Sequence, residues 1–220
     1  MERILAELRD AAGAPVMFVG AQGAFSAGLD LKEVGALAGD AAVAFLRLLE
    51  RCMTAIYLYP GPTAAAVNGH AIAGGCVITL ACDVRVAADD PSIRIGLNEV
   101  ALGLRFPPRT LALVRARLAK RAESEVLLGA ALLSPQDALR VGMVDALAKD
   151  PIAAAREKLE AMASHPPEAY AQTKRDLRGT EQTLCSDAAL DRWIEESIGV
   201  WTSPELRARL AKALERRPKE

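Results

Sequence analysis

The sequence predicts an α/β fold that is followed by a helical region. Short apolar runs such as Thr63–Val67 alternate with helical patterns and short turns as far as Ala87, and such alternation is typical of an α/β domain. The pattern is helical from Pro151 onward. The 220 residues suit one large domain with a helical appendage. We therefore expect an α/β core over residues 1–150 and a helical oligomerisation region over residues 151–220.

Composition narrows the class of protein. Hydrophobic residues make up 51% of the chain and aromatic residues only 4%, which predicts a large core of small side chains. The formal net charge is −1, so nucleic acid is not expected as a partner. No apolar run reaches the roughly 18 residues that a membrane span needs, and the acidic, amphipathic N-terminus is unlike a signal peptide. We therefore expect a cytoplasmic protein without a membrane span.

The cysteines and histidines do not predict a metal site. Cys52, Cys76, Cys82 and Cys185 show no metal-ligand spacing, and the chain has only two histidines. Three of the cysteines lie in apolar elements, which favours a reduced compartment over a disulfide framework.

The N-terminal part of the chain predicts a helix, a strand and a second, long helix. Met1–Ala12 has apolar residues at helical spacing and is followed by a glycine. Pro15–Gly20 is a continuous apolar run, typical of a buried parallel strand, and a loop over Ala21–Leu29 follows it. Asp30 opens a D-x-x-E arrangement that resembles a capping box, so a helix N-cap is favoured over a catalytic role. The long helix is expected over Asp40–Tyr59.

A glycine pair opens the helix at the centre of the chain. The strand Thr63–Val67 turns at Asn68, and Gly74 and Gly75 then lead into an apolar helix over Cys76–Ala81. Glycines at a helix start let a ligand approach the backbone and expose N–H groups that have no partner within the helix. The helix dipole favours an oxygen that gains negative charge there. Each such donor lowers a reaction barrier by roughly 3–4 kcal/mol.

A single carboxylate follows this helix. The strand Asp83–Ala87 leads to Glu99, which stands among Leu97, Val100 and Leu102. Apolar neighbours would desolvate the carboxylate and raise its pKa, as a proton shuttle near neutral pH needs. The stretch therefore predicts a site that forms and stabilises an enolate, with a surface glutamate in a loop as the alternative reading.

The rest of the chain is expected to be mostly helical. Helices are predicted over Pro107–Leu118 and Lys120–Leu128. A further helix begins at Ser134, an N-cap followed by proline, and ends at Gly142. Met143–Leu147 predicts one more short strand. The C-terminal helices carry apolar residues, which we expect to pack on another subunit: Leu184, Leu190, Trp193, Ile194, Ile198 and Trp201.

Several motifs together resemble the crotonase (enoyl-CoA hydratase/isomerase) superfamily. They are AFSAGLDL from Ala24, NGHAIAGGC from Asn68, ACDVRVAADD from Ala81 and GLNEVALGL from Gly96. One glycine-rich loop would be weak evidence, but these stand in the order and spacing of the family. The resemblance implies a crotonase-like ββα spiral with C-terminal helices and a homotrimer or hexamer. It also implies an acyl-CoA thioester substrate, with coenzyme A as part of the substrate and no separate cofactor.

The family normally begins with two strands before its first helix. This sequence begins at that helix, so we expect the N-terminal strands to be missing and one edge of the first sheet to be unprotected.

The resemblance also implies residue roles. The backbone N–H groups of Leu29 and Gly74 would hold the enolate oxygen, and Glu99 would be the acid/base residue. The same two motifs would contribute the substrate-binding residues Ser26, Ala27, Gly28, Leu29, Asp30, Gly74 and Asn98. The alternative is that these glycines only form turns and have no role in binding. This sequence departs from the family pattern at His70, which is more readily explained as a turn histidine with its own hydrogen bond than as a substrate contact. It also departs at Leu104-Arg105-Phe106-Pro107, where the acyl pocket of the family is lined.

One position separates two reactions. Hydratases of the family carry a second glutamate three residues after the glycine equivalent to Gly74, where this chain has Val77. Adding water calls for two polar groups, whereas moving a double bond needs one base. The motifs FSAGLDL and GLNE also resemble those of the mitochondrial-type Δ3-Δ2-enoyl-CoA isomerases, so the resemblance implies an isomerase of fatty-acid metabolism. The alternatives are a hydratase, a thioester hydrolase, a decarboxylase, or an idle subunit that only binds acyl-CoA.

Overall fold

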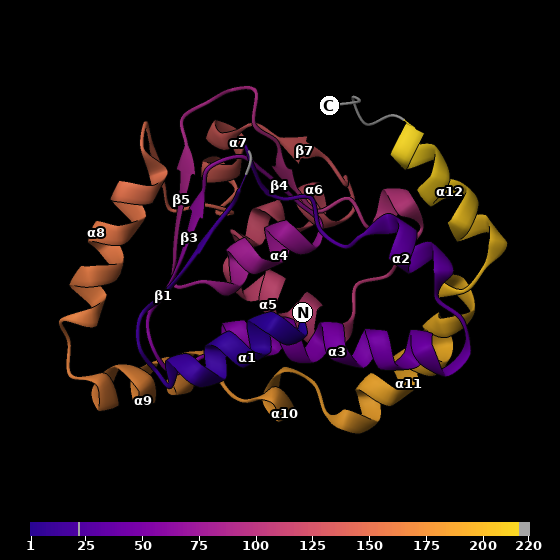
Figure 1. Cartoon of the computed structure of the whole chain (residues 1–220), viewed down its shortest axis with the longest axis horizontal. Coiled ribbons are helices and arrows are strands. Elements are labelled where there is room, and N and C mark those ends of the chain that lie inside the picture. The colour runs from indigo at the N-terminus through magenta and orange to yellow at the C-terminus, as the bar shows by residue number, and fades with distance from the viewer. Residues whose placement is uncertain (22, 216–220) are drawn as a thin grey trace.

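The computed structural model describes residues 1–21 and 23–215. Gln22, in the predicted loop, and residues 216–220, in the predicted helical region, lie outside the described residues. The strands form two four-stranded sheets (Figure 1). The first sheet contains, in spatial order, β1 (Val16–Val19), β3 (Thr63–Val67), β5 (Val84–Ala88) and β8 (Ala146–Ala148), all parallel. The second contains β2 (Ala24–Ser26), β4 (His70–Ile72), β6 (Ile95–Gly96) and β7 (Leu132–Leu133), and only the β6–β7 pair is antiparallel.

Helices surround both sheets. The first group comprises α1 (Glu2–Ala11), α2 (Leu31–Ala36), α3 (Gly39–Tyr57), α4 (Gly74–Ala81), α5 (Pro108–Arg117), α6 (Glu123–Leu127) and α7 (Pro135–Arg140). Two short 3-10 helices accompany them, η1 (Val100–Leu102) and η2 (Lys120–Ala122). The C-terminal group comprises α8 (Pro151–Ala163), α9 (Pro167–Arg178), α10 (Glu181–Leu184), α11 (Asp187–Trp201) and α12 (Pro204–Glu215).

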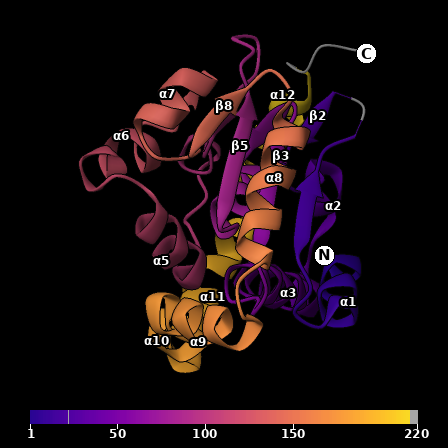
Figure 2. The same ribbon diagram turned by 90° about the vertical axis from the view of Figure 1, so that its left-hand side faces the viewer.

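The small residues of β3 let the first sheet be covered on both faces. Because side chains alternate along a strand, Ala64 and Ala66 point to one face, where they pack with Leu159 of α8. Ala65 and Val67 point to the other face and belong to the main core. Figure 2 shows α8 lying along β3 and β5. The sheet is thus buried between α8 and the core that the remaining helices complete.

The structure confirms the α/β class and the C-terminal helices, and the helix caps are where the sequence predicts them. The Asp30 carboxylate accepts hydrogen bonds from the N–H groups of Lys32 and Glu33 at the start of α2. The Ser134 hydroxyl accepts one from Asp137 N–H at the start of α7. Caps of this kind satisfy donors that the helix itself leaves free.

Four details of the predicted elements are wrong. β1 is the edge strand of its sheet and is only half-buried, with Val19 42% exposed. The predicted loop over Ala21–Leu29 contains β2, and His70 begins β4 instead of lying in a turn. The last strand starts at Ala146 and not at Met143. The strands β2, β4 and β8 are only three residues long, so they carry too little period-2 signal to be read from sequence.

The helices beyond residue 151 pack within the chain. Leu190, Trp193, Ile194 and Trp201 of α11 are all buried in the main hydrophobic core. A separate oligomerisation region stays a prediction. No helix of residues 1–21 and 23–215 is long and apolar enough to cross a membrane.

Candidate functional site

The site is built at the carboxyl ends of three neighbouring parallel strands. β2, β4 and β6 lie side by side, and each leads directly into one of the predicted motifs. Leu29 follows β2, Gly74 follows β4 and Glu99 follows β6. The Ala73 N–H donates to the Gly96 carbonyl at 2.9 Å, which ties the second motif to the third. Ligands of open sheets characteristically bind at this end of the strands.

The first two motifs approach each other closely because both contain glycine. A methyl group at Gly28 would lie 3.1 Å from the Gly74 nitrogen and 3.0 Å from the Ile72 carbonyl oxygen. A methyl group at Gly74 would lie 3.9 Å from the Leu29 nitrogen. Gly28 also has φ +88°, which disfavours other residues. The backbone N–H groups of Leu29 and Gly74 are therefore held near each other at one point.

Ser26 and Gly75 stabilise the contact between the first two motifs. The Gly28 N–H donates to the Ser26 hydroxyl at 3.2 Å, so the turn of the first motif is held by its own serine. A methyl group at Gly75 would lie 2.2 Å from the Ser26 carbonyl oxygen, a distance that no packed structure tolerates. Ser26 and Gly75 thus fix the seat of α4 against β2.

Ala73 carries backbone strain at the same point. It precedes α4 with φ 50° and ψ −121°, a conformation that residues with a Cβ rarely adopt. Strained residues cost about 1–3 kcal/mol and persist where the surroundings enforce them, often at functional sites. Ala73 directly precedes Gly74, the residue that begins α4.

The N–H groups of Leu29 and Gly74 are available to a ligand. Gly74 is the first residue of α4, so its N–H has no partner within that helix. Among the described residues, no acceptor is paired with the Leu29 N–H. Two convergent donors, one of them at a helix N-terminus, suit an oxygen that becomes negatively charged.

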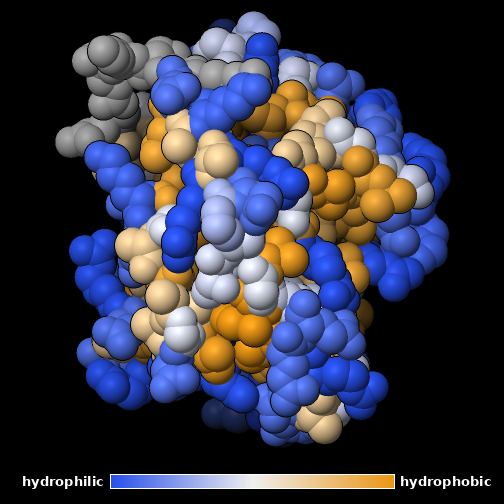
Figure 3. All heavy atoms as spheres, turned by 90° about the vertical axis from the view of Figure 1, so that its right-hand side faces the viewer, coloured by the Kyte–Doolittle hydropathy of each residue, from blue (hydrophilic) through white to orange (hydrophobic). Residues whose placement is uncertain are grey.

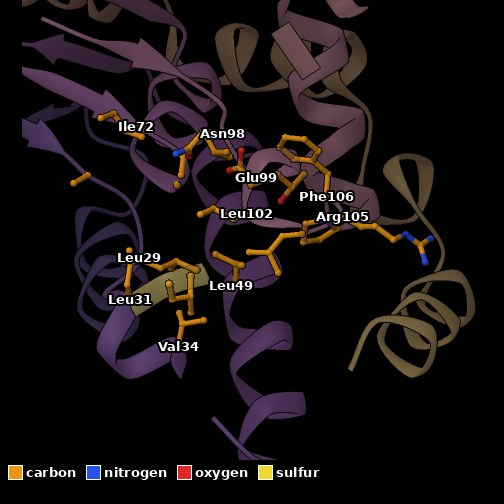
Figure 4. Close-up of a pocket in the computed structure, with 18 of the residues that line it drawn as sticks. Leu29, Leu31, Val34, Leu49, Ile72, Asn98, Glu99, Leu102, Arg105 and Phe106 are labelled. Atoms are coloured by element: carbon orange, nitrogen blue, oxygen red, sulfur yellow. The ribbon is translucent and has the colours of Figure 1, made fainter. Parts of the chain in front are cut away.

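Leu29 and Gly74 both line a cavity of about 270 Å³. Most of its walls are apolar and come from segments far apart in the sequence. The lining residues are Ala27, Leu29, Leu31, Val34, Leu49, Met53, Ile72, Ala73, Gly74, Val77, Asn98, Glu99, Leu102, Leu104, Arg105, Phe106, Pro107, Thr110, Leu132, Trp201, Leu210 and Ala213. Figure 4 shows Glu99 and Asn98 on one side and Leu29, Leu31 and Val34 across from them.

Glu99 is the one carboxyl group that lines the cavity within residues 1–21 and 23–215. Burial among apolar side chains raises the pKa of Glu99 to about 7, partly opposed by a hydrogen bond to its own backbone. Its Oε2 atom is buried and has no hydrogen-bond partner in the described chain. The Phe106 ring lies beside the carboxyl group in Figure 4. A carboxyl group in this state can accept or release a proton near neutral pH.

The other polar residues of the cavity differ in what they can offer a ligand. The Oδ1 atom of Asn98 is buried and, within the described chain, unpaired. The Thr110 hydroxyl donates a hydrogen bond to Glu50. The Arg105 guanidinium points away from the cavity and pairs with Glu196 at 3.2 Å (Figure 4).

The structure brings most of the predicted site residues together. Ala27, Leu29, Gly74, Asn98 and Glu99 all line the cavity. Ser26 and Gly28 lie behind it as the support of the first motif. Asp30 is exposed and caps α2, outside the cavity lining. The substrate-binding and catalytic roles themselves stay predictions.

Val77, which marks the reaction in the sequence, also lines the cavity and is 3% exposed. His70 lies outside the lining, where its Nδ1 accepts a hydrogen bond from the Arg94 N–H at 2.9 Å. It is a satisfied histidine, as expected, although it belongs to a strand.

Sequence reasoning missed the far wall of the cavity. Leu49 and Met53 come from α3, Trp201 from α11, and Leu210 and Ala213 from α12. Of these residues, the sequence predicts a place only for Trp201, at a subunit interface. An apolar side chain gives the same helical periodicity whether it faces the core or a cavity, so no sequence signal separates the two.

Comparisons with known proteins agree with the geometry. The family model described as enoyl-CoA hydratase/isomerase matches residues 1–199. A putative enoyl-CoA hydratase of Thermus thermophilus is 32% identical over 192 residues, which cover 83% of this chain and 75% of that protein. Human mitochondrial enoyl-CoA delta isomerase 1 is 35% identical over 123 residues, which cover 56% of this chain and 41% of that protein. The matched segment thus spans less than half of the human protein.

Solved structures give the same result. The crystal structure of human mitochondrial delta3-delta2-enoyl-CoA isomerase superposes with a TM-score of 0.86 at 25% identity, covering 98% of this chain and 85% of that chain. An enoyl-CoA hydratase/isomerase from Mycobacterium paratuberculosis gives a TM-score of 0.80 at 25% identity, covering 96% and 84%. Hydratases and isomerases are therefore both among the similar proteins.

Proposed function

The chain belongs to the enoyl-CoA hydratase/isomerase family, and on that premise we propose that it is an enoyl-CoA isomerase. It moves the double bond of an acyl-CoA thioester from position 3 to position 2. The observation that carries the proposal is that Glu99 is the single carboxyl group lining the cavity in the described chain. The backbone N–H groups of Leu29 and Gly74 belong to the same cavity. One base and one anion-binding point are what this reaction needs.

The proposed steps use these three residues. The Glu99 carboxylate removes a proton from C2 of the 3-enoyl thioester, and the electron pair of the C–H bond passes into an enolate. The enolate oxygen accepts hydrogen bonds from the N–H groups of Leu29 and Gly74, whose positions are fixed in advance. Glu99 then returns the proton to C4 as the double bond forms between C2 and C3. A pKa of about 7 suits a group that both takes and gives the proton.

The side chain of Val77 supports isomerisation over hydration. It lines the cavity one turn into α4, where the family resemblance places the second glutamate of hydratases. An isopropyl group offers no hydrogen bond to a water molecule. Water added to a double bond must be both held and deprotonated, and Glu99 alone would have to do both.

The second candidate function is hydration of a 2-enoyl-CoA. The similarity to a putative hydratase over most of the chain favours it. Asn98 supplies a polar atom without a partner in the described chain, which a water molecule would suit. Thioester hydrolysis, decarboxylation and acyl-CoA binding without turnover use the same anion-binding point and are kept as further outcomes.

Product analysis separates these functions. The purified protein is incubated with a 3-enoyl-CoA, a 2-enoyl-CoA, a saturated acyl-CoA and a malonyl-type thioester, and the products are resolved by mass and chromatography. We expect the 3-enoyl-CoA to become a 2-enoyl-CoA and the other three to persist. Efficient formation of a 3-hydroxyacyl-CoA would show a hydratase. Free coenzyme A, carbon dioxide, or binding without any product would identify the other outcomes.

Replacing Val77 tests the argument from its side chain. Val77→Glu places a second carboxyl group in the cavity, and we expect hydration of 2-enoyl-CoA to rise while stability falls because a new charge is buried. Val77→Gln is the matched control, since it has the size of glutamate without its basicity. Equal hydration by both variants would show that a carboxyl group at position 77 does not decide between isomerisation and hydration.

A further inference from the structure

Glu50 is a carboxylic acid that the proposed reaction does not use, although it lies directly behind the cavity. It belongs to α3 and its side chain is completely buried, at 0% exposure. Burial raises the pKa of Glu50, and hydrogen bonds from Thr110 and the backbone of Arg109 oppose the shift. A buried carboxyl group destabilises a fold unless it is hydrogen-bonded. The groups that form hydrogen bonds with Glu50 therefore indicate its role.

Within the described residues, the hydrogen-bond partners of Glu50 lie at the start of α5. Its Oε2 accepts a hydrogen bond from the Arg109 N–H at 3.0 Å. Its Oε1 accepts one from the Thr110 N–H at 3.3 Å and a second from the Thr110 hydroxyl. The residue that precedes α5, Pro107, offers no side-chain cap. Glu50 thus caps α5 from a different helix, and the positive end of the α5 dipole stabilises its negative charge.

The first turn of α5 is also a wall of the cavity. Phe106, Pro107 and Thr110 line it from α5 and the segment before it. Leu49 and Met53, which flank Glu50 on α3, line the adjoining wall. The three hydrogen bonds of Glu50 therefore join the two helices at the place where both border the cavity.

The same turn is tied to the C-terminal helices. The side chain of Arg109 is 5% exposed, and its Nε donates to the Cys185 carbonyl at 3.2 Å. Its guanidinium also pairs with Glu181 at 3.5 Å and with Asp187 at 2.5 Å. Asp187 begins α11, whose far end contributes Trp201 to the cavity. A shift of the first turn of α5 would thus move the parts of the cavity wall that α3, α5 and α11 contribute.

We propose that Glu50 is a positioning residue that fixes the walls of the apolar part of the cavity and thereby sets which acyl chains bind. The inference rests on the proposed function for the identity of the ligand, an acyl-CoA. Glu50 touches no reacting atom. It acts through the start of α5, and its loss widens or collapses the pocket that holds the distal carbons of the acyl group.

The test compares Glu50→Gln with Asp150→Ala. The glutamine has the size of glutamate, but its amide nitrogen cannot accept, so an N–H of Arg109 or Thr110 loses its acceptor. Asp150 is the matched control: it also accepts from two successive N–H groups, at 3.1 and 3.0 Å, but it caps α8, which does not line the cavity. Thermal unfolding of both variants shows how much stability each has lost.

The readout is the dissociation constant of saturated acyl-CoA thioesters of short and long chain, measured by calorimetry. We expect Glu50→Gln to weaken binding of the long chain by roughly 10-fold or more and to leave the short chain within about 2-fold, since misplaced walls act at a distance from the thioester. Asp150→Ala should keep the wild-type ratio of the two constants. Glu50→Ala, where it folds, should change that ratio further than the glutamine does.

Two results would overturn the proposal. One is an unchanged ratio in Glu50→Gln at reduced stability, which would make Glu50 a structural cap only. The other is a wild-type protein whose affinity does not depend on chain length. A failure of the proposed isomerisation looks different, because the saturated thioesters still bind while a 3-enoyl-CoA gives no product.

Discussion

The Glu99 carboxyl group holds its proton more tightly than an ordinary glutamate because the apolar walls of the cavity remove water from it. Its buried Oε2 has no partner in the described part of the chain, so the hydrogen bond to its own backbone compensates the negative form only in part. The same isolation that makes Glu99 a poor structural residue makes it a suitable proton carrier. Two predictions follow from that opposition, one about rate and one about stability.

The first prediction concerns the rate. Glu99→Gln keeps the size of the side chain but cannot accept a proton, so kcat for isomerisation of a 3-enoyl-CoA should fall by roughly 10²–10⁴-fold. The wild-type rate should itself decline as the pH drops through about 7, because the base form is lost there. Deuterium placed at C2 should reappear partly at C4, because one group carries it. A folded variant that isomerises at the wild-type rate would remove Glu99 from the mechanism.

The second prediction concerns stability. The pKa of Glu99 is about 7 in the folded chain and 4.5 in an ordinary glutamate. Between these values the unfolded chain has lost the proton that the folded chain keeps, so stability falls as the pH rises and the full cost is present above about pH 7. Glu99→Gln should therefore be more stable than the wild type at about pH 8, by about 3 kcal/mol at most.

Urea unfolding at two pH values checks this sign. At about pH 4 both forms of the protein carry an uncharged side chain at this position, and their stabilities should agree. A variant that is less stable than the wild type at the higher pH would show that Glu99 is a paired, structural carboxylate.

At the scale of elements, α4 is held at both ends. Its N-terminus meets the first motif through Gly75 and Ser26. Its C-terminal carbonyls accept hydrogen bonds from buried or half-buried arginines: Arg117 reaches Leu80 and Cys82, and Arg178 reaches Ala81. Cations at a helix C-terminus complement the helix dipole. The helix that offers the Gly74 N–H is thus fixed along its whole length.

A methyl group at Gly75 should displace the N-terminus of α4 from its contact with Ser26. Gly75→Ala places a carbon 2.2 Å from the Ser26 carbonyl oxygen, and because that atom is backbone, the helix must move. We expect a loss of about 1–3 kcal/mol in unfolding free energy and a slower reaction, since the N–H groups of Leu29 and Gly74 separate.

Gly199→Ala is the control for that variant. Gly199 lies in α11 with open space around it, so alanine should stabilise the helix by about 0.5–1 kcal/mol and leave the rate unchanged. Denaturant unfolding and steady-state kinetics on both variants make the comparison. Equal effects of the two substitutions would mean that the contact with Ser26 does not position the helix.

At the scale of the whole molecule, the C-terminal helices are parts of the core. A buried cluster binds α9 to the first sheet: Asp83 pairs with Lys174 at 2.7 Å and with Arg178 at 2.6 Å. α8 covers one face of that sheet, and α11 supplies Trp193 and Trp201 to the main core. Removing such a buried network leaves uncompensated charge behind.

Truncation tests this dependence. A chain that ends at residue 150 loses α8 and α11, which exposes the face of β3 and β5 and the apolar side of α3. We expect an aggregating fragment without a cooperative unfolding transition, whereas the intact chain unfolds cooperatively. Circular dichroism during heating, together with light scattering, measures both. A soluble fragment with native-like unfolding would show that residues 1–150 form an independent core.

The association of the chain into trimers stays a prediction. Figure 3 shows the side of the molecule that carries α11 and α12, where apolar side chains are exposed in separate areas with hydrophilic side chains between them. Interfaces of stable complexes combine apolar and polar area in this way. Sedimentation equilibrium at micromolar concentration distinguishes a monomer from a trimer or hexamer.

The motifs that carry the proposed chemistry and most of the helices could be predicted from the residues alone. Glycine is required at position 28 by a positive φ and a tight contact, and at position 75 by a backbone approach that leaves no room for a side chain, so their spacing carries information about one local geometry. The caps at Asp30 and Ser134 are local for the same reason, since each side chain bonds to its own helix. The lone carboxylate at Glu99 could be predicted as a single acid among apolar residues, of which Leu102 lines the same cavity, whereas Val100 is 43% exposed.

How these motifs and helices come together could not be predicted, because it depends on contacts between distant parts of the chain. Three strands, β2, β4 and β6, bring Leu29, Gly74 and Glu99 to one end of a sheet, yet each strand is too short to be recognised alone. The distal wall combines Met53 with Trp201, and Glu50 bonds to a helix 59 residues away. Hydrophobic burial is non-directional, so an apolar pattern predicts that one face of a helix or strand is buried but does not predict which segment packs against it. That choice is made by packing, which is a property of the whole chain.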